Sequence, residues 1–165
     1  MVVVVNGPDD AQPGDDTADG DETAVRGEAV LGADDATASD APDTVGLQAA
    51  NLPYFCLAKV DYPHNSHTTR STINVHFDTN CRQVAPNLST EGALYRSRWY
   101  GWEHLTTSRG GKSNSRSLRV VAPKHCSKDS WYRYRGEARF YVSGPQGRGS
   151  AYVYNQNDKE IKCTG

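Results

Sequence analysis

The chain has 165 residues and a formal net charge of −2 at pH 7, and this near-neutral total hides two chemically different parts. Residues 1–50 hold 12 of the 20 Asp and Glu residues, one arginine and no aromatic or cysteine residue, whereas residues 51–165 hold 17 of the 18 Lys and Arg residues, all 15 aromatics and all four cysteines. The composition excludes one uniform globular unit and predicts an acidic leader, 1–50, followed by a basic domain, 51–165. No apolar run approaches the ~18 residues of a membrane-spanning helix.

The leader lacks the large apolar side chains that would offset the entropy of ordering a chain, about 1–2 kcal/mol per residue. We therefore expect it to be disordered, with a marginal short helix over residues 24–31 as the one local exception. The valines at positions 2–5 are compatible with the end of a secretory signal whose upstream part is missing. Two roles stay open for the leader, an intramolecular contact that masks the basic domain or a solubilising spacer.

The four cysteines all lie in the basic domain, and no two of them form a CxxC pair. Zinc-ribbon and thioredoxin-like sites therefore lose their main support, and two disulfides become the favoured interpretation. Four cysteines permit three connectivities; we favour Cys56–Cys81 and Cys126–Cys163 because each closes a compact unit. Four free thiols are the alternative. Disulfides imply an oxidising compartment, so we expect a secreted, extracellular protein.

From residue 53 onward the apolar side chains repeat with a period of two, which is typical of β-strands. Strands are expected over residues 54–62, 71–81, 88–105, 118–122, 131–142, 150–154 and 158–163, with a bulge at Gly101, a flexible hairpin loop over 109–115 and a turn over 144–149. No segment has a convincing helical period. The pattern predicts an all-β fold, an antiparallel immunoglobulin-like β-sandwich of six to eight strands.

Four segments of the basic domain carry a resemblance to a known class. They are Phe55-Cys-Leu-Ala-Lys-Val-Asp-Tyr-Pro-His64, Val75-His-Phe-Asp-Thr-Asn-Cys81, Ala93-Leu-Tyr-Arg-Ser-Arg-Trp99, and the end that runs from Cys126 through Tyr132-Arg-Tyr-Arg135 to Cys163. In these segments the domain resembles small secreted actinobacterial proteins that form two-disulfide β-sandwiches rich in Tyr and Trp. The resemblance covers residues 51–165 and implies the fold, export and a Gram-positive envelope setting. It brings no catalytic residues.

Arginines and aromatic side chains form the candidate binding surface. Arg133, Arg135 and Arg139 share one side of the strand expected over 131–142. Guanidinium groups bind phosphate, carboxylate or sulfate groups bidentately and stack on planar rings. The alternative is a solvated strand face that discourages edge pairing. The full candidate set is Arg96, Arg98, Arg133, Arg135, Arg139, Trp99 and Trp131, to which Arg116 and Arg119 would add if their strands are neighbours.

Other chemistry has weaker support in the sequence. A zinc site would require the rings of His64, His67 and His76 to converge, and we expect no metal and no other cofactor. A ribonuclease-like site would pair Glu103 or Glu137 with His104 or His125. Glu103 and His104 are adjacent, however, and on a strand they would point to opposite faces. The sequence contains no GxSxG, P-loop, HExxH or GxGxxG motif, and we assign no catalytic residue.

These observations lead to two functional hypotheses. The first is a secreted, non-enzymatic module that binds an anionic polymer, either nucleic acid or a cell-wall polymer, or a protein partner. The alternative is a small extracellular nuclease or toxin that its acidic leader masks. Salt-sensitive binding without turnover would favour the first hypothesis.

Overall fold

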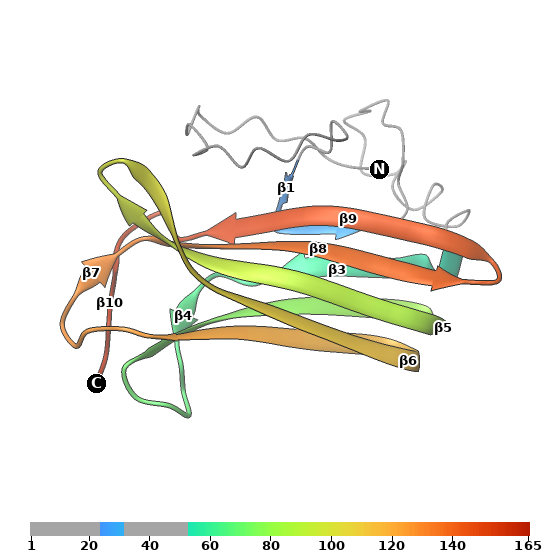
Figure 1. Cartoon of the computed structure of the whole chain (residues 1–165), viewed down its shortest axis with the longest axis horizontal. Coiled ribbons are helices and arrows are strands. Elements are labelled where there is room, and N and C mark those ends of the chain that lie inside the picture. Colours follow the sequence, from blue (N-terminus) through green and yellow to red (C-terminus); the bar gives the residue numbers. More distant parts are fainter. Residues whose placement is uncertain (1–23, 32–52) are drawn as a thin grey trace.

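The computed structural model describes residues 24–31 and 53–165, and within these residues it contains no α-helix. A 3-10 turn, η1 (Pro53–Phe55), precedes β3 and the strands that follow it. The strands of the described residues are β1 (Val25–Arg26), β2 (Glu28–Val30), β3 (Cys56–Val60), β4 (His64–Asn65), β5 (Thr72–Arg98), β6 (Gly101–His125), β7 (Trp131–Tyr132), β8 (Tyr134–Gly144), β9 (Gly147–Gln156) and β10 (Ile161–Lys162). Eight of them form one sheet, and β7 pairs with β10 in a small second sheet (Figure 1).

The long hairpin β5–β6 organises the main sheet. β5 has 27 residues and β6 has 25, and a two-residue turn at Trp99 and Tyr100 joins them. β6 follows one edge of β5 along its whole length, while β4, β3 and then β8 follow the other edge. A register shift between Asn80 and Ala85 separates the β3 half of β5 from the β8 half. One continuous strand therefore serves two halves of the sheet.

Residues 24–31 connect the two ends of this sheet. β1 pairs in parallel with β9, and β2 pairs antiparallel with β3. Between them, the Gly27 N–H donates to the Tyr154 carbonyl oxygen at 2.7 Å, and the Gly27 carbonyl accepts from the Val60 N–H at 2.8 Å. Gly27 has a φ of 87°, which glycine adopts without steric cost. The sheet consequently curls until it is nearly barrel-shaped.

The core lies inside this curl and is built from alternate residues of the strands. Phe77, Leu94, Tyr134 and Phe140 are all at most 2% exposed. Gly92 lies opposite the Phe77 ring, and any Cβ at that position would collide with the ring. The missing side chain thus makes room for the largest aromatic group from the β3 half of β5.

Both predicted disulfides are present. Cys56 and Cys81 lie directly opposite each other on β3 and β5, and their Cα atoms are 4.0 Å apart. Cys126, just after β6, joins Cys163, just after β10, with the Cα atoms 6.0 Å apart. The second bridge attaches the C-terminal segment to the end of the long hairpin, which compensates for the small area of the β7–β10 sheet.

The structure confirms an all-β, disulfide-linked domain and corrects several local expectations. The loop expected over 109–115 is wrong, because these residues continue β6 and its backbone stays paired with β5. The bulge expected at Gly101 is also wrong, because a hairpin turn ends there and the irregularity lies at Leu94 and Tyr95. The two facing layers of an immunoglobulin-like sandwich stay a prediction, since the main strands form one curled sheet.

The helix expected over residues 24–31 is wrong as well. This part of the expected leader contributes β1 and β2, and it buries Val25, Ala29 and Leu31 in the core. Pairing with β3 and β9 gives the segment a hydrogen-bonded environment that its own short sequence could not provide as a helix. The disorder expected for residues 1–23 and 32–50 lies outside the described residues.

We expect Leu31 of the leader to be required for the stability of the domain. Leu31 is fully buried, and its N–H donates to the Cys56 carbonyl oxygen at 3.0 Å. Leu31→Ala should lower the free energy of unfolding by about 2–5 kcal/mol, because it leaves a cavity in the core. Glu28→Ala, at an exposed position of the same segment, should change it by less than about 0.5 kcal/mol. Urea unfolding measures both, and equal stability of the two variants would contradict the packing of this segment.

Candidate anionic-ligand surface

The strand β8 presents its arginines on one side. Tyr134, Ala138, Phe140 and Val142 point into the core, and the intervening residues point outward. This alternation is the one predicted from the sequence. Arg135 and Arg139 of β8 lie on this outer side, and Arg133 precedes the strand with the same parity. Because β8 lies between β5 and β9, side chains of both neighbouring strands flank the arginines.

Each of these arginines lies over an aromatic ring. The Arg135 guanidinium carbon is 4.2 Å from the ring centroid of Tyr154, and that of Arg139 is 4.7 Å from Tyr152. Arg133 and Arg135 also lie over Trp102, at 5.7 Å and 5.9 Å. Such contacts orient a guanidinium through attraction to the ring's π-electrons. We call this set, Arg133, Arg135, Arg139, Trp102, Tyr152 and Tyr154, the arginine–aromatic face.

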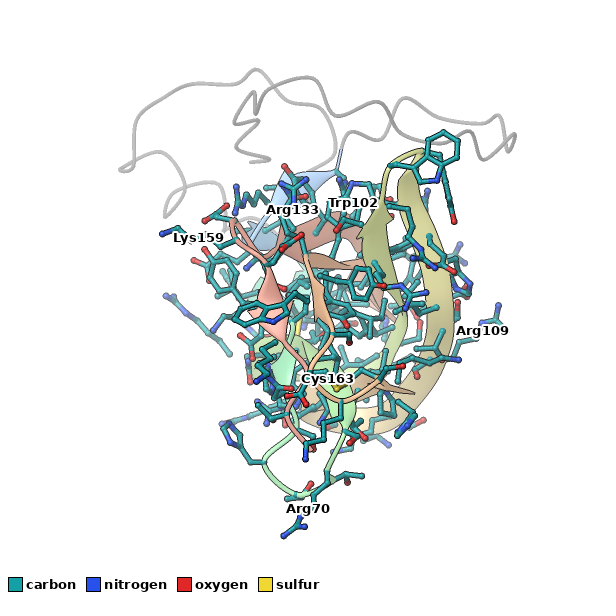
Figure 2. All side chains as sticks on the ribbon, turned by 90° about the vertical axis from the view of Figure 1, so that its left-hand side faces the viewer. Arg70, Trp102, Arg109, Arg133, Lys159 and Cys163 are labelled. Carbon is teal, nitrogen blue, oxygen red and sulfur yellow. A yellow bond between two sulfur atoms is a disulfide. The ribbon has the colours of Figure 1, made fainter. Side chains whose placement is uncertain are left out.

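An extra residue in β6 brings Trp102 onto this face. Leu94 pairs with Thr106, but the next residue, Tyr95, pairs with His104, so Leu105 is an additional residue in β6. An inserted residue reverses the side to which the following side chains point. Trp102 therefore lies on the side of Tyr95 and away from the core. Figure 2 shows Trp102 and Arg133 close together at one edge of the molecule, with Arg70 at the opposite end.

Arg135 is neutralised by a half-buried carboxylate. Its Nε lies 2.7 Å from Glu137 Oε1, and the two side chains are only 13% and 14% exposed. The hydroxyl group of Tyr152 donates to Glu137 Oε2 at 2.6 Å. Burial, together with the neighbouring negative charge of Glu137, raises the pKa of Tyr152 well above its usual range, so this hydroxyl stays protonated. No carboxylate among the described residues forms an ion pair with Arg133.

Arg96 and Arg98 lie on the other side of the hairpin. Both donate to Glu103 Oε2, at 2.6 Å and 2.9 Å, and both lie over the ring of Tyr132. The hydrogen bond from Arg96, reinforced by the one from Arg98, lowers the pKa of Glu103, which therefore stays ionised. Two cations share one carboxylate here, so this group keeps a net positive charge.

The turn between β5 and β6 carries two exposed rings, which we call the aromatic tip. Trp99 is 95% exposed and Tyr100 is 55% exposed. Their ring centroids are 5.3 Å apart with an interplanar angle of 88°, so Tyr100 meets Trp99 edge to face. The turn projects from the end of the sheet in Figure 1. The two adjacent exposed rings form a small apolar patch, which makes the tip a candidate contact site.

The structure therefore divides the predicted surface. Arg133, Arg135 and Arg139 share the outer face, whereas Arg96 and Arg98 point to the opposite side of the hairpin. Trp99 is at the tip, and Trp131 lies on β7, where it is 55% exposed.

Two other arginines of the predicted surface lie off the arginine–aromatic face, and three rings that belong to this face were outside the predicted set. Arg119 does not join the face, because it pairs with Asp78 at 2.6 Å in the other half of β5, and Arg116 is exposed on β6. Trp102, Tyr152 and Tyr154 were not predicted from the sequence. The two tyrosines alternate with buried Ala151 and Val153, a signal that was available in the sequence.

The candidate catalytic pairs do not assemble among the described residues. Glu103 is held by two arginines, while His104 points to the other side and its Nε2 lies 2.7 Å from Thr107 Oγ1. The rings of His64 and His76 lie 5.0 Å apart, with His67 next to His64. Even so, no group of three His, Cys, Asp or Glu residues in the described part of the chain is arranged to hold a metal ion.

Within residues 24–31 and 53–165, no helix is long and apolar enough to cross a membrane. No protein-family model matches the chain, and no curated protein sequence matches it. Seven chains of solved structures do match. One is the solution structure of a candidate late embryogenesis abundant (LEA) protein, which is 14% identical; the match covers 74% of this chain and 79% of that chain with a TM-score of 0.44.

We expect Arg135 to support the fold more than its neighbour Arg133 does. Arg135→Gln would leave the half-buried Glu137 without its cation, and should lower the free energy of unfolding by about 1–3 kcal/mol. Arg133→Gln, which breaks no ion pair of the described residues, should cost less than about 0.5 kcal/mol. Chemical unfolding of the two variants gives the comparison, and an equal loss in both would show that the Arg135–Glu137 pair is not structural.

Proposed function

We propose that this protein is a non-enzymatic binding module that recognises an anionic polymer through its arginine–aromatic face. The observation that carries the proposal is the row of arginines along one side of β8, each lying over a ring at 4.2–5.9 Å. Rings that hold these long side chains in place reduce the entropy lost when a ligand binds. Guanidinium groups then contact phosphate or carboxylate oxygens with two hydrogen bonds each.

The charge of the domain supports the same proposal. Residues 53–165 contain 17 Lys and Arg residues against eight Asp and Glu residues, an excess of nine positive charges. An excess of this size creates a long-range field that attracts polyanions and speeds their association. On the face itself, Glu137 neutralises Arg135, so Arg133 is the arginine best placed to contact the ligand directly.

No observation favours the alternative of a nuclease or toxin. In the described part of the chain, His104 is bound to Thr107 and Glu103 is bound to two arginines. A phosphodiester-cleaving site requires a general base and a general acid within hydrogen-bond reach of the substrate. On the outer side of the sheet that carries the arginine–aromatic face, Arg135 and Tyr152 already occupy Glu137, Arg109 occupies Glu91, and His104 contacts Thr107.

The two disulfides also bear on the compartment in which the protein folds. Two disulfides in a small domain are typical of proteins that fold in an oxidising compartment. We accordingly propose an exported protein, related to the small secreted actinobacterial proteins that its sequence resembles. The curled sheet would then correspond to the two facing layers of an immunoglobulin-like sandwich, joined through β5.

The proposal predicts that two arginines of the face govern salt-dependent binding. Arg133→Gln with Arg139→Gln should weaken binding of a fluorescent single-stranded oligonucleotide or of an anionic wall polymer. It should also flatten the dependence of log affinity on log salt, by about 0.7 for each phosphate of a single strand that the variant no longer neutralises. Fluorescence anisotropy at several salt concentrations measures both quantities.

Arg70→Gln with Arg82→Gln is the matched control, because it removes the same charge from exposed positions that lie off the arginine–aromatic face. This control should leave the salt slope unchanged. Equal losses in both double variants would mean that net charge alone, and no particular surface, attracts polyanions. Absence of binding by the full chain and by a chain without residues 1–23, which carry seven carboxylates, would contradict the proposal itself.

A further inference from the structure

The aromatic tip and the arginine–aromatic face are continuous. Trp99 and Tyr100 form the turn, and Trp102, two residues further on, lies under Arg133 and Arg135. From there the face runs along β8 to Arg139 and Tyr152. Arg139 lies six residues after Arg133, which is about 20 Å along an extended strand. A single extended polymer can therefore contact the tip and the face together.

The tip has the geometry of a stacking platform. The rings of Trp99 and Tyr100 meet at nearly a right angle, so their contact covers at most one flat face of the indole, and Trp99 is 95% exposed. An exposed ring of this kind gains stability when a planar group covers it. Bases of single-stranded nucleic acids stack on such rings, which is worth about a 5- to 150-fold change in affinity for each base.

The face is suited to the same type of ligand. Guanidinium groups that cover Tyr154 and Tyr152 at 4.2 Å and 4.7 Å can themselves stack with bases, as arginines do in complexes with single-stranded RNA. The two cations that share Glu103, directly behind the tip, add the positive charge that a phosphate backbone requires. A polymer without planar groups would be attracted to the arginines but would have no group to stack on Trp99.

We infer that the anionic polymer is a single-stranded nucleic acid, with one base stacked on Trp99 and the phosphates following the arginines of β8. This inference rests on the proposed function and specifies its ligand. A duplex would not serve, because its base faces are buried in the stack and cannot reach the indole. The site would cover a few nucleotides, as single-strand binding sites of comparable domains do.

The test compares two ligands of equal charge on the full chain. One is a fluorescent 12-mer of deoxythymidine, which is long enough to span a site of a few nucleotides; the other is an abasic phosphodiester of the same length. We expect the thymidine oligomer to bind about 10-fold more tightly than the abasic one. Trp99→Ala should remove most of that advantage, Trp99→Phe should keep most of it, and neither variant should change the affinity for the abasic oligomer.

Trp131→Ala is the matched control, since it removes another exposed tryptophan, which lies on β7 in the small second sheet and outside the aromatic tip. If both oligomers bind equally and Trp99→Ala has no effect, the inference fails while the proposed function stands. If neither oligomer binds, the inference fails, and the proposed function fails as well if an anionic wall polymer is bound neither by the full chain nor by the chain without residues 1–23. Binding of anionic phosphatidylglycerol vesicles that is lost in Trp99→Ala, without a preference for thymidine, would make the tip a lipid contact and overturn the inference. Unfolding curves of each variant exclude loss of the fold.

Discussion

The strand β5 is the constraint on which the rest of the structure depends. It supplies a continuous edge to β6 and, on its other edge, first β3 and then β8. Because side chains alternate within each half of β5, on either side of the register shift between Asn80 and Ala85, β5 fixes which residues of its partners point into the core. For this reason the arginine side chains of β8 point away from the core. A shift of one residue in the β5–β8 register would place Arg135 in the core and Phe140 in solvent.

The additional residue Leu105 in β6 is the second feature on which the arginine–aromatic face depends. Without the additional residue at Leu105, Trp102 would point to the side of Arg96 and Arg98 and would not meet Arg133. The bulge thereby assembles rings from β6 and β9 around arginines of β8. Bulges often redirect a side chain in this way next to functional sites. The same change of side leaves Glu103 with Arg96 and Arg98, which separates the two groups of cations.

Part of this architecture could be read from the sequence. The alternation over residues 131–142 indicated both the core side and the arginine side of β8, and the cysteine spacing favoured the observed pairs. The length of β6 could not be inferred, because the Gly- and Ser-rich residues 109–115 look like a loop, yet β5 pairs with most of them. Residues 24–31 were missed for a related reason, since they become strands only in contact with β3 and β9. The side of Trp102 depends on one inserted residue, which no periodic pattern reveals.

If the tip and the arginine–aromatic face together hold a single-stranded polynucleotide, both surfaces must respond to the same ligand at the same concentration. A titration of the ¹⁵N-labelled full chain with the thymidine oligomer, followed through the Trp indole N–H and Arg Nε–H signals, measures this response. We expect Trp99, Trp102 and Arg133 to shift together and to saturate together, while Arg70 and Arg82 stay unchanged. Shifts that appear at Arg70 or Arg82 first, or a saturated complex in which Trp99 and Trp102 do not move, would contradict binding across the two surfaces.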